Sequence, residues 1–262
     1  MAVACLPLLG ACSGAAAAGD AGLISIMNGD GAGGAGGASG AAGAGAGAGG
    51  AGGGDASDAV PAPDAPADAG SAPTAAQLLA LTKTCASVQS AHAYATDDGA
   101  PMNVDICGLD GAVFWTADMD VDCDGRNVGD GKCPGDDCCY LPATAFTTKT
   151  GQYLAASVTP YVVIPTDFRP PGLTGGNVVA VIYGGKVQYA VFGDTGPDNI
   201  IGEASYACAA ALGIDPDPLT GGTDGPVTYI AFLGSGAIPP DIEDQTATRQ
   251  LGETLATQLL SH

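Results

Sequence analysis

The first third of this chain cannot build a folded core, and this limits every other interpretation of the sequence. Gly, Ala, Pro and Asp dominate it, and no Lys or Arg precedes Lys83. Such residues bury too little apolar surface to offset the entropy of ordering a backbone. Aromatic and β-branched residues become frequent only from about residue 76. That leaves about 185 residues, enough for one domain with a single core.

Residues 13–75 are predicted to form a disordered tether. Its first part is nearly all Gly and Ala, whereas residues 55–73 add Pro and Asp and should be stiffer. The tether either holds a folded head away from a membrane or is a neutral spacer. We expect the folded domain to span residues 76–262.

Residues 1–12 read MAVACLPLLGAC, an apolar run that resembles a bacterial lipoprotein signal. In such a signal the chain is cut before the cysteine, here Cys12, and lipid is added to its sulfur. No positively charged residue precedes the run, which departs from the typical pattern. We expect export and lipid anchoring through Cys12, because no later run of about 20 apolar residues could span a bilayer.

The charge balance restricts the partners of this protein. It has 28 acidic and 7 basic residues, a net charge of −21. Such a field repels nucleic acid and anionic lipid head groups, and it attracts polycations. The charge is equally explained as a device that keeps an exported protein soluble.

The cysteines indicate an oxidising compartment rather than a metal site. Seven of the nine lie in or near the predicted domain: Cys85, Cys107, Cys123, Cys133, Cys138, Cys139 and Cys208. They lack a paired C-x-x-C framework, and neither histidine lies near their main cluster, so structural zinc is not expected. Because seven is odd, at least one thiol is free or pairs between chains. We expect Cys123 and Cys133 to close a short acidic loop.

The pattern of apolar residues predicts mostly strands with a few helices. Residues 178–183 and 186–192 flank Gly184-Gly185 and are typical of a tight β-hairpin. Further strands are expected at 113–115, 160–165 and 227–232. Helices are expected at 76–90, at 203–212 with a stop at Gly213, and at 242–260.

An acidic pair follows the hairpin. Asp194 leaves its second strand and enters a Gly/Pro turn, and Glu203 follows nine residues later where a helical pattern starts. If both face one cleft, they offer the protonated acid and the ionised carboxylate that glycosidic bond cleavage needs. Taken alone, the spacing favours a plainer explanation, a turn-forming Asp and a Glu near a helix N-terminus.

Four aspartates alternate before Gly125, namely Asp118, Asp120, Asp122 and Asp124. In an extended strand they lie on one face. Their pattern resembles the start of a calcium loop, but Gly131 stands where an EF-hand needs a bidentate Glu. A one-off calcium site, a solvated acidic turn and a row that binds cationic groups remain as interpretations.

The aromatic residues do not by themselves indicate a sugar-binding surface. Trp115 is the only tryptophan. Its V-F-W context is more typical of a core residue than of a platform on which sugars stack. Tyr140, Tyr161 and Tyr183 fit either role.

Several motifs together resemble glycoside hydrolase family 75, the fungal-type chitosanases. They are FWTADMDVDCDG at 114–125, TPYVVIP at 159–165, YAVFGDTGP at 189–197, IGEAS at 201–205, ALGI at 211–214 and Gly221-Gly222 before the strand at 227–232. Each motif is short, and their order along residues 110–236 is the specific feature. This chain is thus identified as a bacterial exported member.

The resemblance implies an endo-acting, inverting hydrolase of β-1,4-linked glucosamine that needs no cofactor or metal. The essential carboxylates of the family fall on Asp194 and Glu203, with Glu203 as the general acid. A helix N-terminus would lower the pKa of Glu203, so burial or repulsion from Asp194 must outweigh it, or the roles are exchanged. The aspartate row would bind the ammonium groups of chitosan. We expect a monomer with chitosan as its partner.

The D-T-G-P and I-G-E motifs also resemble double-psi β-barrel hydrolases, some of which cleave peptidoglycan. We therefore expect a mainly β fold, a small six-stranded double-psi-like β-barrel with peripheral helices. The alternative functions are a peptidoglycan-cleaving enzyme and a non-catalytic acidic surface binding module, with or without calcium.

Overall fold

The computed structural model describes residues 72–88, 92–133 and 140–262. The helices are α1 (Ala75–Leu81), α2 (Tyr206–Leu212), α3 (Gln245–Leu260) and the short 3-10 helix η1 (Ser235–Ala237). The strands are β1 (Cys107–Leu109), β2 (Ala112–Asp122), β3 (Tyr161–Pro165), β4 (Val178–Tyr183), β5 (Lys186–Gly196), β6 (Glu203–Ser205) and β7 (Thr223–Phe232). The predicted signal with Cys12, residues 13–71 of the tether, and Cys138 and Cys139 lie outside the described residues.

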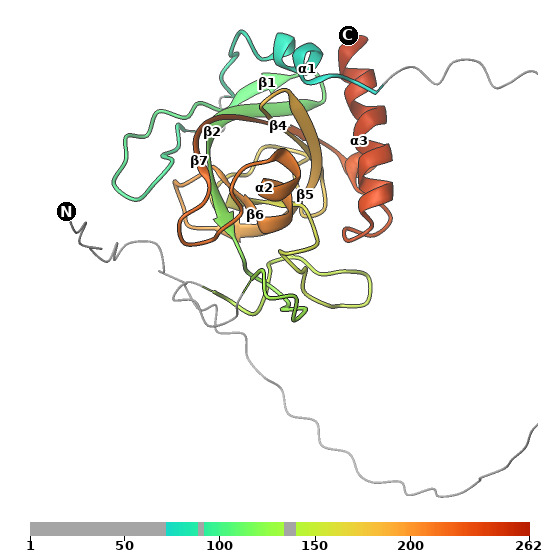
Figure 1. Cartoon of the computed structure of the whole chain (residues 1–262). Coiled ribbons are helices and arrows are strands. Elements are labelled where there is room, and N and C mark those ends of the chain that lie inside the picture. The colour runs from blue at the N-terminus through green and yellow to red at the C-terminus, as the bar shows by residue number, and fades with distance from the viewer. Residues whose placement is uncertain (1–71, 89–91, 134–139) are drawn as a thin grey trace, which may run out of the picture. The chain divides into compact units, whose positions relative to one another are not determined.

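Six strands close into a barrel, seen in Figure 1. They follow the order β2–β6–β3–β5–β4–β7, and the ring closes because β7 pairs with β2 as well as with β4. The β2–β6 and β3–β5 pairs are parallel, and the other pairs of the ring are antiparallel. β1 pairs with β2 outside the ring. The predicted six-stranded barrel with peripheral helices is confirmed.

The β4–β5 hairpin forms as its turn sequence predicts. Gly184 and Gly185 connect the strands, and both have positive φ, 55° and 80°. Two consecutive positive φ angles match the right-handed twist of the flanking strands, and glycine adopts them without a Cβ penalty.

The barrel interior is filled by one face of each strand. Along β2 the core side chains are Val113, Trp115, Ala117 and Met119, at every second residue. Trp115 is fully buried and stacks on Tyr229 with 5.2 Å between ring centroids. Trp115 is therefore a core residue, as predicted. The even-numbered residues of β2 consequently face outward.

Two further apolar clusters cover the outside of the barrel. One joins α1 and α3 to the outer face of β4 and β7, and Figure 1 shows α3 alongside the barrel. The other lies outside β3 and β5 and includes Leu154, Tyr161, Val163 and Val191. The second cluster supports the acidic residues described below.

The predicted helix boundaries need three corrections. α1 ends at Leu81 instead of continuing to residue 90. α2 begins at Tyr206 rather than at Glu203, because the Ser205 side chain caps it by accepting a hydrogen bond from the Cys208 N–H. α3 begins at Gln245 rather than at 242, after an Asp244 cap. Gly213 ends α2 in the left-handed conformation, as predicted.

Two disulfides lie within the described residues. The expected Cys123–Cys133 bond is present, and a second bond joins Cys85 to Cys107. Among the described cysteines, Cys208 is free and buried. The two bonds are typical of a protein that folds in an oxidising, extracellular compartment. None of the described helices has the length and apolar character needed to cross a bilayer.

Candidate active site

Asp194 and Glu203 lie on the same outer face of the barrel, one on each side of β3. Val163 of β3 is the register partner of both, of Asp194 on β5 and of Glu203 on β6. Register partners point to the same face of a sheet, so the three side chains form a row. Two strand spacings separate the backbones of Asp194 and Glu203, about 10 Å.

A β-bulge in β5 turns Asp194 onto this face. Val162 pairs with Phe192, and the next residue, Val163, pairs with Asp194, so Gly193 is the extra residue. Without the bulge, alternation would point Asp194 into the barrel. A Cβ at Gly193 would lie 2.5 Å from the Cβ of Tyr161 and 2.7 Å from Leu154 Cδ1. Only glycine fits here without displacing these neighbours.

The Glu203 side chain reaches across β3 toward β5. Its Oε2 lies 3.5 Å from where a Cβ of Gly196 would be, and Val163 Cγ1 lies 3.0 Å from the same point. Gly196 is on the same strand as Asp194 and two residues beyond it. The absent side chain at Gly196 therefore leaves room for the Glu203 carboxyl beside Asp194.

Backbone donors hold Asp194 in place. Its Oδ1 accepts hydrogen bonds from the N–H groups of Ala145, at 2.8 Å, and Thr195, at 2.7 Å. Asp194 is 6 % exposed. Burial, followed by the charge of Asp122, raises the pKa of Asp194 to about 7 despite these two donors.

Glu203 also holds its proton more strongly than an ordinary glutamate. Burial and then the charges of four aspartates (Asp122, Asp120, Asp124 and Asp194) raise its pKa well above the usual value. Because Glu203 lies on β6 and precedes the cap of α2, it is outside the first turn, where the helix dipole acts most strongly. The helix dipole, which would lower the pKa of Glu203 and so oppose a role as general acid, therefore acts on Glu203 only weakly.

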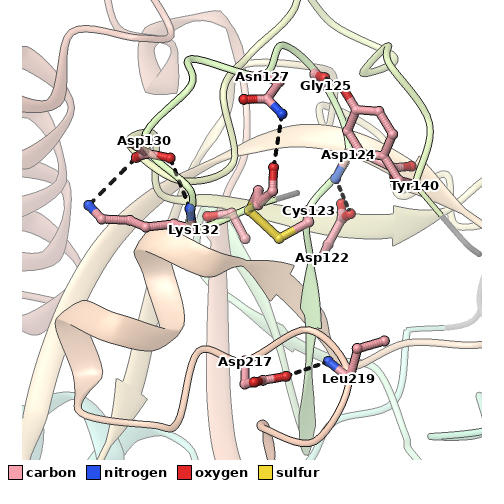
Figure 2. The surroundings of a disulfide bond; sticks show 12 residues. Asp122, Cys123, Asp124, Gly125, Asn127, Asp130, Lys132, Tyr140, Asp217 and Leu219 are labelled. Carbon is pink, nitrogen blue, oxygen red and sulfur yellow. Dashed lines mark hydrogen bonds and ion pairs between the residues drawn. A yellow bond between two sulfur atoms is a disulfide. The ribbon is translucent and has the colours of Figure 1, made fainter. Parts of the chain in front are cut away.

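The β2 aspartates extend the row but divide into two groups. Asp120 is the register partner of Glu203, and Asp122 is that of Ser205. Asp122, Asp124 and Asp194 have carboxylate oxygens within 4.8 Å of one another, and so do Asp97, Asp118 and Asp120. Figure 2 shows Asp122 and Asp124 on either side of disulfide-bonded Cys123.

The second group borders a hollow in the surface. Asp118 lines a hollow of about 370 Å³ together with residues such as Asn103 and Asp224. The Asp118 Oδ1 is buried and has no hydrogen-bond partner among the described residues. Burial, followed by the charge of Asp120, raises the pKa of Asp118 to about 7. At this end of the row one buried carboxylate oxygen therefore lacks a donor.

The spacing of either group would accept a cation, but we assign no metal ligands. In the first group the protein's own donors already serve each residue. Asp122 accepts from the Asp124 N–H at 2.7 Å, Asp124 from the Leu141 N–H at 2.7 Å, and Asp194 as described above. These bonds account for the closeness of the carboxylates without an ion.

Sequence reasoning missed the contribution of Tyr161. Its side chain is fully buried, and its hydroxyl lies 3.0 Å from Asp122 Oδ2 and 2.9 Å from the Asp124 carbonyl oxygen. Tyr140 is also structural, because its hydroxyl donates to the Gly125 carbonyl. The apolar motif TPYVVIP predicts that Tyr161 is buried. It does not predict the contact with Asp122, because that contact depends on the pairing of β3 with strands distant in sequence.

A family model described as fungal chitosanase of glycosyl hydrolase group 75 matches residues 119–258. This chain belongs to that family. The matched residues hold Asp194, Glu203 and three of the four aspartates of the row, Asp120 and Asp122 on β2 and Asp124 just after it, so the resemblance in the sequence is confirmed.

Endo-chitosanases of Aspergillus are similar to this chain. Endo-chitosanase C of Aspergillus oryzae is 36 % identical over 166 residues, which are 57 % of this chain and 41 % of that protein. Endo-chitosanase B of Aspergillus oryzae (strain ATCC 42149 / RIB 40) is 34 % identical over 155 residues, 51 % of this chain and 64 % of that protein. The chain thus spans less than two thirds of the length of these relatives.

Replacing Gly193 by alanine should disturb the bulge and the carboxylate that it orients. We expect Gly193→Ala to lower the free energy of unfolding by about 1–3 kcal/mol through overpacking against Tyr161, measured by urea denaturation. Gly236→Ala is the matched control, because a Cβ there meets no atom within 4 Å. Equal stability of the two variants would contradict the role given to Gly193.

Proposed function

We propose that the family 75 chain is an endo-acting, inverting chitosanase, which hydrolyses β-1,4 linkages between glucosamine units. The observation that carries the proposal is the row in which Val163 separates Asp194 from Glu203. Inverting glycosidases keep their two carboxyl groups about 6.5–9.5 Å apart, so that a water fits beside the sugar. The two backbones lie two strand spacings apart, about 10 Å, and the Glu203 side chain reaches from β6 toward β5, which supports a separation of the carboxyl groups in that range.

Glu203 is the general acid of the proposed reaction. Its raised pKa keeps it protonated at a pH at which an ordinary glutamate is ionised. It gives this proton to the glycosidic oxygen as the bond to the anomeric carbon breaks.

Asp194 is the general base. Its Oδ1 is held by two backbone N–H groups, which favour its ionised form relative to Glu203 and leave Oδ2 to accept a proton from water. That water attacks the anomeric carbon on the face opposite to the leaving group. Like-charge repulsion from four aspartates disfavours the ionised form of Glu203, which supports this division of roles.

The carboxylates of the β2 row suit a polymer of positive charge. Each glucosamine unit of chitosan carries one ammonium when protonated, whereas the acetylated units of chitin carry none. Asp118, Asp120 and Asp124 are proposed to give charge-assisted contacts with successive sugars. Asp122, expected from the sequence to share this role, is buried and already hydrogen-bonded to the protein, so it is left out of these contacts. The net charge of −21 favours the approach of such a polycation to the site. Peptidoglycan, largely acetylated and bearing anionic stems, gains nothing from this field.

The proposed place of action is outside the cell. The disulfides Cys85–Cys107 and Cys123–Cys133 support export. Lipid on Cys12 and the segment 13–75 would hold the domain at a surface as a monomer, within reach of an external polymer.

Removing either carboxylate should abolish hydrolysis. We expect Asp194→Asn and Glu203→Gln each to slow the viscosity loss of a chitosan solution at least about a hundredfold. Asp110→Asn also removes one negative charge, but at an exposed residue of a loop, and should keep the parent rate. Circular dichroism would show that all variants are folded.

The same experiment separates the alternatives. A parent protein that clears cell walls and ignores chitosan would indicate a peptidoglycan-cleaving enzyme. A parent that binds chitosan without cutting it, equally well after both substitutions, would indicate a binding module.

The proposed reaction uses no metal. We therefore expect dialysis against a chelator to leave the rate of chitosan hydrolysis unchanged, and added calcium to have no effect. Loss of activity that calcium restores would show that a bound ion is needed and would contradict this part of the proposal.

A further inference from the structure

Asp122 differs from the other aspartates of the row because the protein already occupies both of its oxygens. It is 6 % exposed. Its Oδ2 accepts from the Tyr161 hydroxyl at 3.0 Å, and its Oδ1 accepts from the Asp124 N–H at 2.7 Å. A carboxylate that is buried and supplied in this way is poorly placed to hold the ammonium of a substrate.

The position of Asp122 is nevertheless central. It follows Asp120, the register partner of Glu203, by two residues on the same face of β2. One of its carboxylate oxygens lies within 4.8 Å of oxygens of Asp124 and Asp194. Its carboxylate is thus close to the proposed base, and strand register places it diagonally across from the proposed acid, Glu203.

Tyr161 is built to keep Asp122 ionised. It is fully buried below the carboxylates, and its Cβ packs where Gly193 has no side chain. Burial and then the charge of Asp122 raise the pKa of Tyr161 well above its usual value, so the phenol remains a donor at any working pH. A donor that never ionises favours the charged form of its acceptor.

The charged groups that face Glu203 are all carboxylates. They come from β2 and the segment after it and from β5, namely Asp120, Asp122, Asp124 and Asp194. From β3, the uncharged Val163 lies beside Glu203, and the Tyr161 hydroxyl acts on Glu203 only indirectly, because it donates to Asp122. On the side of α2, the Lys132 ammonium lies 6.0 Å from the Tyr206 ring and pairs with Asp130.

We propose that Asp122 is a positioning residue, whose ionised carboxylate, held by Tyr161 and the Asp124 N–H, keeps the proton on Glu203. A nearby negative charge disfavours a second one in a half-buried site. Burial raises the pKa of Asp122 to about 6, and the hydrogen bonds that it accepts oppose this shift and favour its ionised form. Its importance for catalysis rests on the proposed function.

Glu203 can be observed directly, because the chain contains three glutamates, Glu203, Glu243 and Glu253. Protein labelled with [13C]glutamate gives three side-chain carboxyl signals, and Glu203→Gln assigns one of them. In the parent, we expect Glu203 to titrate well above the range of an ordinary glutamate. Glu243 and Glu253 pair with Arg126 and Arg249 and serve as internal references.

Asp122→Asn removes the charge and keeps the shape. We expect the Glu203 midpoint to fall by about one pH unit, a tenfold weaker hold on the proton, while Glu243 and Glu253 do not move. Tyr161→Phe should shift the Glu203 midpoint in the same direction by less, because Asp122 then loses one donor. Asp110→Asn, an exposed residue beyond the opposite end of β2, should shift nothing.

Kinetics give a second readout if the protein hydrolyses chitosan. With less negative charge nearby, both Glu203 and Asp194 lose protons at lower pH, so the whole pH profile of kcat/KM should move down in Asp122→Asn. If Asp122 instead bound a substrate ammonium, Asp122→Asn would raise KM without moving the pH profile of kcat/KM.

The titration decides the inference even if chitosan is not a substrate. An unchanged Glu203 midpoint in both Asp122→Asn and Tyr161→Phe would overturn it, as would a parent Glu203 that titrates like Glu253. Absence of hydrolysis with a normal shift would reject the proposed function and leave the electrostatic link between Asp122 and Glu203 in place.

Discussion

The whole arrangement depends on how β5 pairs with β3 at Gly193. The extra residue reverses the alternation of β5, so that Asp194 faces outward beside Val163 instead of into the barrel core. Glu203 arrives on the other side of Val163 from a separate strand. A closed barrel fixes these strands against one another. The separation of the two backbones is therefore set by strand spacing, not by the loop that connects them.

The second determinant is the scarcity of cations around the carboxylates. Arg126 is paired with Glu243, which also accepts from the Thr159 hydroxyl, and Lys132 is paired with Asp130. Among residues 72–88, 92–133 and 140–262, the donors to these carboxylates are backbone N–H groups and one phenol. The acidic groups of the site therefore hold protons more tightly than they would in water, which suits acid catalysis.

Local sequence signals predicted much of the fold. The Gly184-Gly185 turn, the stop at Gly213 and the Cys123–Cys133 bond depend on neighbouring residues, and each is confirmed. The site was predicted less completely. Placing Glu203 in a helix was wrong because three residues pair with β2 and β3 before α2 begins, and the bulge and the Tyr161–Asp122 bond arise from strand pairing between distant segments. Family motifs identified Asp194 and Glu203, and the pairing of β5 and β6 with β3 explains why these two residues lie on one face.

The stereochemistry of the product tests the central claim most directly. If a water lies between Asp194 and the anomeric carbon, early 1H NMR spectra of a chitosan digest should show the α-anomer appearing first, before mutarotation. Initial release of the β-anomer would mean that the two carboxyl groups act at about 5 Å through a covalent intermediate. That result would contradict a site spaced by two strands.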